Sequence, residues 1–152
     1  MSAPDPKSLM KSDGDGSSNE LPVVEQLGVI TVEMLNTYHC NNPDRRLICM
    51  FGKVYDVTSS IANYGPEGSY KEYAGHDITL ALSMNKTDVK WMDKFVKMDE
   101  KWMKAAKGWS EFYDTKYPIA GTLHVWESGN LDSWPELTPE EREEFEKGCV
   151  IM

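Results

Sequence analysis

The chain has 152 residues, of which 40% are hydrophobic and 27% charged, and its formal net charge is −9. This length and composition predict one globular domain with tails, and the negative charge argues against binding to the phosphate backbone of nucleic acids. No run approaches the about 20 apolar residues of a transmembrane helix, and residues 1–20 lack the apolar core of a signal peptide. We therefore expect neither a nucleic-acid-binding nor a membrane-spanning protein.

Residues 1–26 are predicted to form a disordered N-terminal tail. Ser, Asp, Gly and Pro dominate this stretch, and it has too few large apolar side chains to offset the entropy lost on ordering. Order is expected from Leu27 onward. The sequence "GVITVEML" predicts a short strand that ends at Thr31, whose hydroxyl caps a brief helix reaching Tyr38.

A β-hairpin is predicted in the following segment, "RRLICMFGKVYDVTSS". Two apolar, β-branched runs are separated there by Gly52 and Lys53, and the second run ends near Thr58. This hairpin is the predicted sheet of the domain.

Two helices are predicted in the second half of the chain. Asp77 is placed to cap a short helix in "ITLALSM", and apolar periodicity predicts a longer helix from about Thr87 to Ala106. The segment "FYDTKYPIAGTLHVW" is then expected to be extended and to return to the body of the domain.

Residues 126–152 are predicted to be an acidic C-terminal tail that contains a helix. In "TPEEREEFEKG", Thr138 is the expected cap, Pro139 occupies the first helical position and Glu141 completes a capping box. Gly148 is the expected stop. We expect this helix to be self-contained.

The C-terminal "CVIM" has the form of a C-a-a-X box with Cys149 as the farnesyl acceptor. The alternative is a chance apolar tail. One lipid gives weak, reversible attachment, and the segment before it is acidic where a polybasic second signal would be expected. The sequence thus predicts a cytoplasmic protein bound peripherally to endomembranes, such as the endoplasmic reticulum, through a C-terminal lipid.

The sequence "NYGPEGSYKEYAGHD", from Asn63 to Asp77, crowds three tyrosines around a Gly-Pro-Glu-Gly turn. Glycine and proline satisfy the backbone of such a turn, so the turn itself needs no phenol. A tyrosine is most often a packed ring with a tethered hydroxyl, but three in one loop make this segment the candidate functional site.

Four segments, "GKVYDVT", "YGPEGSY", "YAGHD" and "TKYPIAGTL", together resemble the cytochrome b5-like haem/steroid-binding domain of the membrane-associated progesterone receptor family. The resemblance implies an α+β, cytochrome b5-like fold over residues 27–125, with a small mixed sheet and helices that form a haem or ligand pocket. In this family the tyrosine loop replaces the His-Pro-Gly-Gly motif of true cytochrome b5, which the sequence lacks.

The resemblance also implies roles for four residues. Tyr70 aligns with the tyrosine that ligates haem iron, while Tyr64, Lys116 and Tyr117 align with residues that line the haem and hydrogen-bond to it. A phenolate is a hard anionic ligand that stabilises ferric iron, and a lysine can pair with a haem propionate. The implied cofactor is a non-covalent, b-type haem.

Three departures from the family pattern affect this interpretation. His76 stands where the family usually has arginine, residues 83–109 diverge, and the family's N-terminal membrane helix is missing. A hydrogen-bonding role for His76 is the favoured interpretation, and a second axial ligand is the alternative.

The favoured hypothesis is a haem-binding adaptor, not an enzyme, that senses or delivers haem or modulates partner haem-thiolate monooxygenases. An exposed haem face would permit a haem-dependent homodimer, and binding of a steroid or another small lipid rests on the family name. Two alternatives stay open, namely a haem-free protein-interaction module and an electron-transfer haemoprotein with two axial ligands.

Overall fold

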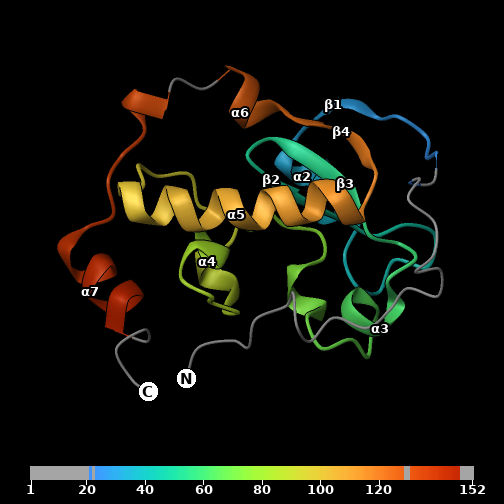
Figure 1. Cartoon of the computed structure of the whole chain (residues 1–152), viewed down its shortest axis with the longest axis horizontal. Coiled ribbons are helices and arrows are strands. Elements are labelled where there is room, and N and C mark those ends of the chain that lie inside the picture. Colours follow the sequence, from blue (N-terminus) through green and yellow to red (C-terminus); the bar gives the residue numbers. More distant parts are fainter. Residues whose placement is uncertain (1–20, 22, 129–130, 148–152) are drawn as a thin grey trace.

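Four short strands form one mixed sheet, which lies behind the long helix α5 (Glu100–Lys116) in the view of Figure 1. The computed structural model describes residue 21, residues 23–128 and residues 131–147. The strands are β1 (Gly28–Ile30), β2 (Leu47–Met50), β3 (Lys53–Asp56) and β4 (Ile119–Leu123). Their order is β1-β4-β3-β2, with β1 parallel to β4 and the other pairs antiparallel.

Short helices surround this sheet. The α-helices besides α5 are α2 (Val32–Asn36), α3 (Ile61–Tyr64), α4 (Thr79–Ser83), α6 (His124–Ser128) and α7 (Pro139–Lys147). The 3-10 turns are η1 (Lys71–Tyr73), η2 (Val89–Trp91) and η3 (Leu131–Ser133). Among the described residues, no helix combines the length and the apolar character that crossing a membrane requires.

The sheet divides the interior into two apolar cores, because side chains alternate along a strand. Ile48 and Met50 of β2 enter the larger core, whereas Leu47 and Cys49 enter the smaller one. The larger core also holds the buried faces of α4 and α5 and the tyrosines of the loop after α3. The candidate site is therefore built on the main core of the domain.

The first predicted strand and helix are confirmed, although the helix ends at Asn36, two residues before the predicted end at Tyr38. Thr31 is the N-cap of α2, and its hydroxyl accepts a hydrogen bond from the Met34 amide at 3.1 Å. Ahead of β1, part of the predicted tail contacts the sheet, since the Gln26 side chain donates to the Ile119 carbonyl at 2.9 Å. Residues 1–20 and residue 22 lie outside the described part of the chain.

The hairpin is also confirmed, but its turn lies one residue earlier than predicted. Phe51 and Gly52 form the turn, with φ values of 52° and 83°, and Lys53 already pairs with Met50. Positive φ at both turn positions is typical of a type I′ hairpin. A Cβ on Gly52 would lie 2.8 Å from Cβ of Trp126, so the close approach of α6 also requires glycine here.

The predicted helix from Thr87 to Ala106 is wrong in both bounds. Only the short turn η2 forms early, residues 92–99 are irregular, and Asp93 adopts a φ of 55° that a continuing helix cannot contain. The helix begins at Glu100 and runs to Lys116, so it includes the first part of the segment predicted to be extended. Its buried face follows helical spacing through Trp102, Ala106, Trp109 and Tyr113.

Asp77 is buried and supports the start of α4, but it lies one residue before the N-cap position that the sequence predicted for it. Its Oδ1 accepts from the Thr79 amide at 3.0 Å, although Ile78 occupies the N-cap position. Its Oδ2 accepts from Nε1 of Trp126 at 2.7 Å. Burial raises the pKa of Asp77 from 3.8 to about 6.

The raised pKa of Asp77 predicts a specific pH dependence of stability. Because the folded protein binds this proton more tightly than the unfolded chain, the free energy of unfolding should decrease as pH rises from about 4 to about 6. The decrease amounts to at most about 3 kcal/mol and is complete above the folded pKa. Urea denaturation of the parent and of Asp77→Asn across this range checks it, since the variant should lack this component. Parallel curves would contradict the assignment.

The C-terminal helix α7 forms with the predicted capping box. The Thr138 amide donates to Oε1 of Glu141 at 2.9 Å, and the Glu141 amide donates to Oγ1 of Thr138 at 3.1 Å. The expectation of a self-contained helix is wrong, because Phe145 is completely buried in the larger core. Its ring lies 4.8 Å from that of Trp91 and 5.0 Å from that of Trp102.

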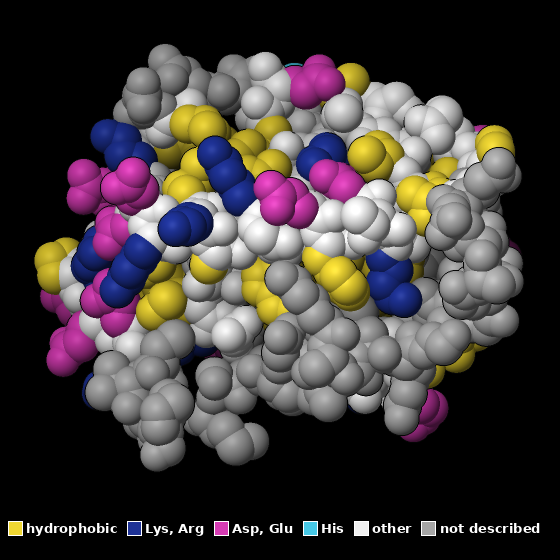
Figure 2. Space-filling view, viewed as in Figure 1, with side chains coloured by type: hydrophobic (Ala, Val, Ile, Leu, Met, Phe, Trp, Pro, Cys, Tyr) yellow, Lys and Arg dark blue, Asp and Glu magenta, His cyan; other side chains and the backbone are white. Residues whose placement is uncertain are grey.

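Ion pairs also join α7 to the domain. Lys94 pairs with Glu141 at 2.9 Å, and Lys90–Glu144 and Arg142–Asp99 make two further pairs. Figure 2 shows acidic and basic side chains interleaved over this end of the molecule, where α7 lies beside the start of α5. Lys90 and Lys94 thus partly neutralise the acidic residues of α7, and Asp99 of the domain pairs with Arg142 of the helix.

Candidate functional site

A tight turn positions the tyrosines that follow α3. The Gly68 amide donates to the Gly65 carbonyl at 2.9 Å, and the Tyr70 amide donates to the Asn63 carbonyl at 2.8 Å. A Cβ on Gly68 would lie 2.4 Å from the Asn63 carbonyl oxygen. Only glycine fits this approach, so the Gly-Pro-Glu-Gly sequence folds the chain back on α3 and brings Tyr70 toward Tyr64.

Five tyrosines of the larger core form what we call the tyrosine cluster: Tyr64, Tyr70, Tyr73, Tyr113 and Tyr117. The rings of Tyr70 and Tyr73 stack at 5.8 Å, and the ring of Tyr64 meets that of Tyr117 edge-on at 6.1 Å. Tyr113 lies 5.7 Å from Tyr117. The three tyrosines with predicted haem roles, Tyr64, Tyr70 and Tyr117, therefore lie in one cluster. They come from α3, from the loop after it and from the residue that follows α5.

Hydrogen bonds fix several of these phenols. The hydroxyls of Tyr64 and Tyr113 lie 2.8 Å apart. The Tyr117 hydroxyl donates to Oγ of Ser60 at 3.2 Å, and the same Oγ lies 2.9 Å from Nδ2 of Asn63. The cluster is thus tied to the start of α3.

Sequence reasoning missed Tyr113. It precedes Tyr117 by four residues, a spacing that places two side chains on one face of a helix. That signal was hidden because the segment was predicted to be extended. Tyr113 is the partner that holds the hydroxyl of Tyr64.

Burial favours the protonated form of tyrosines in this cluster. Desolvation raises the pKa of Tyr64 well above its ordinary value, and it does the same for Tyr113. Both therefore remain neutral phenols that can donate and accept hydrogen bonds. Tyr70 is 4% exposed, against 0% for Tyr64 and 1% for Tyr117, so it is the least buried of the three predicted tyrosines.

Lys116 supplies a positive charge at the edge of the cluster. It is the last residue of α5, and its Nζ lies 5.6 Å from the centre of the Tyr117 ring. The side chain is half-buried. The four residues predicted from the family resemblance thus lie in one region of the molecule.

The His76 side chain contacts a carboxylate that also has other partners. Its Nδ1 lies 2.7 Å from Oδ2 of Asp93, which also accepts from Nδ2 of Asn36 at 3.1 Å. The other carboxylate oxygen of Asp93 accepts from the Asp77 amide at 2.7 Å. One ring nitrogen of His76 is therefore already engaged, in keeping with the hydrogen-bonding interpretation.

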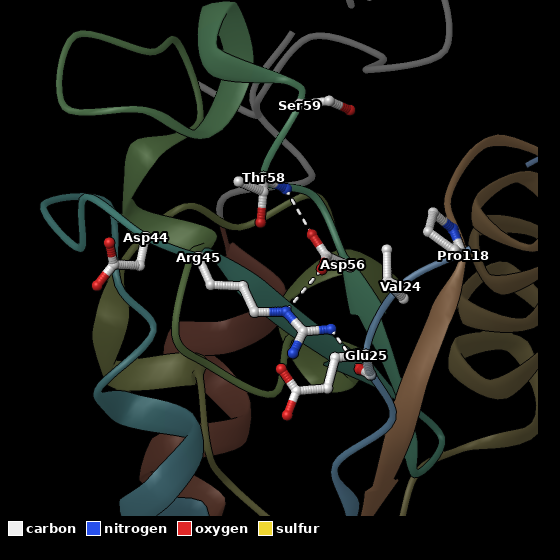
Figure 3. Close-up of a pocket in the computed structure, with 8 residues that line it drawn as sticks. All are labelled: Val24, Glu25, Asp44, Arg45, Asp56, Thr58, Ser59 and Pro118. Atoms are coloured by element: carbon white, nitrogen blue, oxygen red, sulfur yellow. Dashed lines mark hydrogen bonds and ion pairs between the residues drawn. The ribbon is translucent and has the colours of Figure 1, made fainter. Parts of the chain in front are cut away.

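A cavity of about 400 Å³ lies near the start of α3, and charged and hydroxyl-bearing residues line it together with Val24 and Pro118 (Figure 3). Nε of Arg45 donates to Oδ2 of Asp56 at 2.7 Å, and Nη2 donates to the Glu25 carbonyl at 2.6 Å. The guanidinium thereby joins β3 to the segment before β1. None of the four predicted haem residues lines this cavity, so we assign its contacts to the support of the fold.

Comparison with known proteins identifies the domain. The family model described as "Cytochrome b5-like Heme/Steroid binding domain" matches residues 31–108. A solved structure from Arabidopsis thaliana, described as having a cytochrome b5-like fold, superposes with a TM-score of 0.60 at 25% identity. It covers 66% of this chain and 94% of its own. The predicted α+β, cytochrome b5-like fold is confirmed.

Two curated relatives extend the comparison. Cytochrome P450 regulator dap1 of Schizosaccharomyces pombe is 29% identical over 97 residues, which are 59% of this chain and 58% of the relative. Membrane steroid-binding protein 1 of Arabidopsis thaliana is 33% identical over 109 residues, 69% of this chain and 49% of the relative. The chain thus spans about half the length of these two relatives. It belongs to the membrane-associated progesterone receptor family of cytochrome b5-like haem/steroid-binding proteins.

Proposed function

We propose that this protein is a haem-binding adaptor in which Tyr70 ligates ferric haem. The observation that supports this most directly is the convergence of Tyr64, Tyr70 and Tyr117, with Lys116 beside them, although these residues come from two segments about 50 positions apart. Tyr64 and Tyr70 are close because they flank the same turn. Tyr117 and Lys116 reach them only through the fold of the domain.

The donor chemistry of these residues fits a haem with an anionic oxygen ligand. A phenol oxygen is an accepted proximal ligand of haem iron, and the surrounding rings provide apolar walls. The family resemblance assigns this role to Tyr70, whereas the Tyr64 hydroxyl lies 2.8 Å from that of Tyr113 and burial raises the pKa of Tyr64. The Tyr70 ring is 4% exposed, so haem uptake requires its phenol oxygen to become more accessible.

The other residues of the cluster would bind and orient the cofactor. When bound, haem supplies a ferric centre that accepts an anionic ligand. Lys116 would pair with a propionate as a point charge, and the Tyr117 hydroxyl would exchange its present acceptor, Ser60, to donate a hydrogen bond near the ligand. Tyr113 would keep the Tyr64 ring in place through their shared hydrogen bond.

We further propose that the adaptor senses or delivers haem, or modulates haem-thiolate monooxygenases, without an enzymatic activity of its own. Support comes from the fission-yeast relative, whose name describes a cytochrome P450 regulator. A steroid or another small lipid is the second candidate ligand, supported by the names of the plant relatives.

Titration of haem-free protein with ferric haem, followed by ultraviolet-visible absorption, tests the haem proposal. We expect one haem per chain and a spectrum of ferric haem with a single anionic oxygen ligand. Absence of binding would favour the haem-free interaction module. A spectrum of two strong axial ligands that is lost in His76→Ala would favour the electron-transfer haemoprotein.

We propose that farnesylation of Cys149, which lies outside the described residues, gives conditional membrane attachment. Each buried methylene of a lipid contributes about 0.8 kcal/mol, which supports transient residence but leaves stable anchoring to a second contact. Cys149→Ser should therefore move the protein from a partly membrane-bound to a soluble pool and leave haem binding unchanged. Fractionation and intact mass from a farnesyltransferase-competent cell check this. An unmodified terminus with unaltered fractionation would reduce "CVIM" to coincidence.

A further inference from the structure

Four lysines lie on the exposed surface around the first half of α5. We call them the lysine stripe: Lys97, Lys101, Lys104 and Lys107. Among the residues that the structure describes, no ion pair engages their ammonium groups. We propose that the lysine stripe binds the anionic surface of a lipid bilayer. It would thereby supply the second contact that stable attachment through Cys149 requires, a role that rests on the farnesylation proposed above.

Residues 85–108 differ in charge from the chain as a whole. They contain seven lysines and four acidic residues, whereas the net charge of the chain is −9. Lys90 and Lys94 pair with glutamates of α7, so their charges are already neutralised. Among the exposed residues from 97 to 108, four lysines stand against one carboxylate, that of Glu100. The lysine stripe is thus a local positive surface on an acidic chain.

Helix geometry places most of the lysine stripe on one face. Lys101, Lys104 and Lys107 recur at every third residue, which keeps them on the same side of α5 over about 9 Å of its length. Small residues lie beside them. Ala105 is exposed, and a Cβ added at Gly108 would find no atom within 4 Å. These residues add no bulk that would hold a flat surface away from the ammonium groups.

A bilayer with anionic headgroups matches this surface in charge. Clusters of about four or more lysines on an amphipathic helix are typical of proteins that bind anionic lipids. At physiological salt the screening length is about 8 Å, so acidic residues that lie further than this from the bilayer are repelled only weakly. Their charge favours the orientation in which the lysine stripe faces the bilayer. The acidic net charge therefore orients the protein and does not prevent binding.

The lysine stripe lies near the attachment point of the proposed lipid. The ion pair between Arg142 of α7 and Asp99, which directly precedes α5, holds the last helix beside the start of α5 (Figure 1). From Arg142 to Lys147 the helix rises about 7.5 Å, and the two further residues to Cys149 span at most about 7 Å. Figure 2 shows several basic side chains over the half of α5 that is nearer α7. One membrane can therefore engage both the lipid and the lysine stripe.

Vesicle binding tests this surface on the full chain, farnesylated by farnesyltransferase and checked by intact mass. We expect binding to be about ten-fold or more tighter to vesicles that contain phosphatidylserine than to phosphatidylcholine alone. The triple variant Lys101→Gln, Lys104→Gln and Lys107→Gln should lose most of this preference and bind phosphatidylcholine as the parent does. Raising the salt to about 1 M, where the screening length is about 3 Å, should have the same effect on the parent.

Single variants with the same change of charge separate the lysine stripe from net charge. Lys104→Gln should weaken binding to phosphatidylserine vesicles by about five-fold, the contribution of one lysine near an anionic bilayer. Lys71→Gln removes one charge at an exposed position of η1 and should leave that binding unchanged. Circular dichroism of each variant establishes that a loss of binding does not reflect unfolding.

A second anchor separates the lysine stripe from farnesylation. With Cys149→Ser and a C-terminal polyhistidine tag, nickel-chelating lipid in the vesicles supplies the attachment. The triple variant should still dissociate faster from phosphatidylserine vesicles than the chain with its lysines, whether or not cells farnesylate Cys149. The role of the lysine stripe is overturned if the parent shows no preference for phosphatidylserine, or if Lys104→Gln and Lys71→Gln behave alike. Either result would leave an acidic protein as the partner that fits this surface.

Discussion

Tyr70→Phe is expected to weaken haem binding by about 100-fold or more and to leave the fold unchanged. The substitution removes only the phenol oxygen, which is the proposed iron ligand, and losing a metal ligand costs at least as much as losing a residue that supports one. The phenyl ring keeps the volume and can still stack on Tyr73 at the observed 5.8 Å. Haem titration with absorption spectroscopy measures the change.

Tyr73→Phe is the matched control for this experiment. Tyr73 is the neighbouring ring of the same stack, but its hydroxyl donates to the Lys86 carbonyl at 2.8 Å and has no proposed role toward iron. We expect this variant to keep the parental spectrum. If Tyr70→Phe takes up haem as the parent does, Tyr70 is not the ligand, and equal losses in both variants would point to packing of the loop.

Phe145→Ala should lower the free energy of unfolding by about 3–5 kcal/mol, the range for deleting a large buried aromatic side chain. Phe145 is completely buried, packs between Trp91 and Trp102, and lies 5.7 Å from Nζ of Lys86. The remaining cavity would lie between α7 and the domain, so docking of this helix should weaken. Urea denaturation followed by tryptophan fluorescence measures both the midpoint and the slope.

Two variants calibrate this result. Phe145→Leu keeps most of the apolar volume and should cost about 1.5 kcal/mol or less. Glu143→Ala changes an exposed position of the same helix and should leave stability unchanged within error. A loss below about 1 kcal/mol for Phe145→Ala would mean that α7 contributes little to the core, contrary to the observed burial.

The candidate site was predictable only where its residues lie close together in the sequence. The turn chemistry of Gly65 and Gly68 and the tyrosines on either side of it can be interpreted locally, and the structure confirms the tight turn that these glycines predict. Lys116 and Tyr117 required the family resemblance, because nothing in their own segment indicates which loop they face. Tyr113 was missed, since its contact with Tyr64 joins residues 49 positions apart.

The sequence by itself determined the elements whose defining hydrogen bonds are local. The Thr31 cap of α2, the hairpin of β2 and β3, and the capping box of α7 each depend on residues within a few positions of one another. Only the tertiary structure decided where α5 begins and ends. Met92 and Val96, whose spacing suggested a helix, instead lie in an irregular segment that packs against the larger core. It likewise decided that α7 docks, since the burial of Phe145 is completed by Trp91 and Trp102, which lie at least 43 residues earlier in the chain. Local hydrogen bonds can be inferred from neighbouring residues, whereas the burial that stabilises a helix depends on which distant surfaces the fold brings against it.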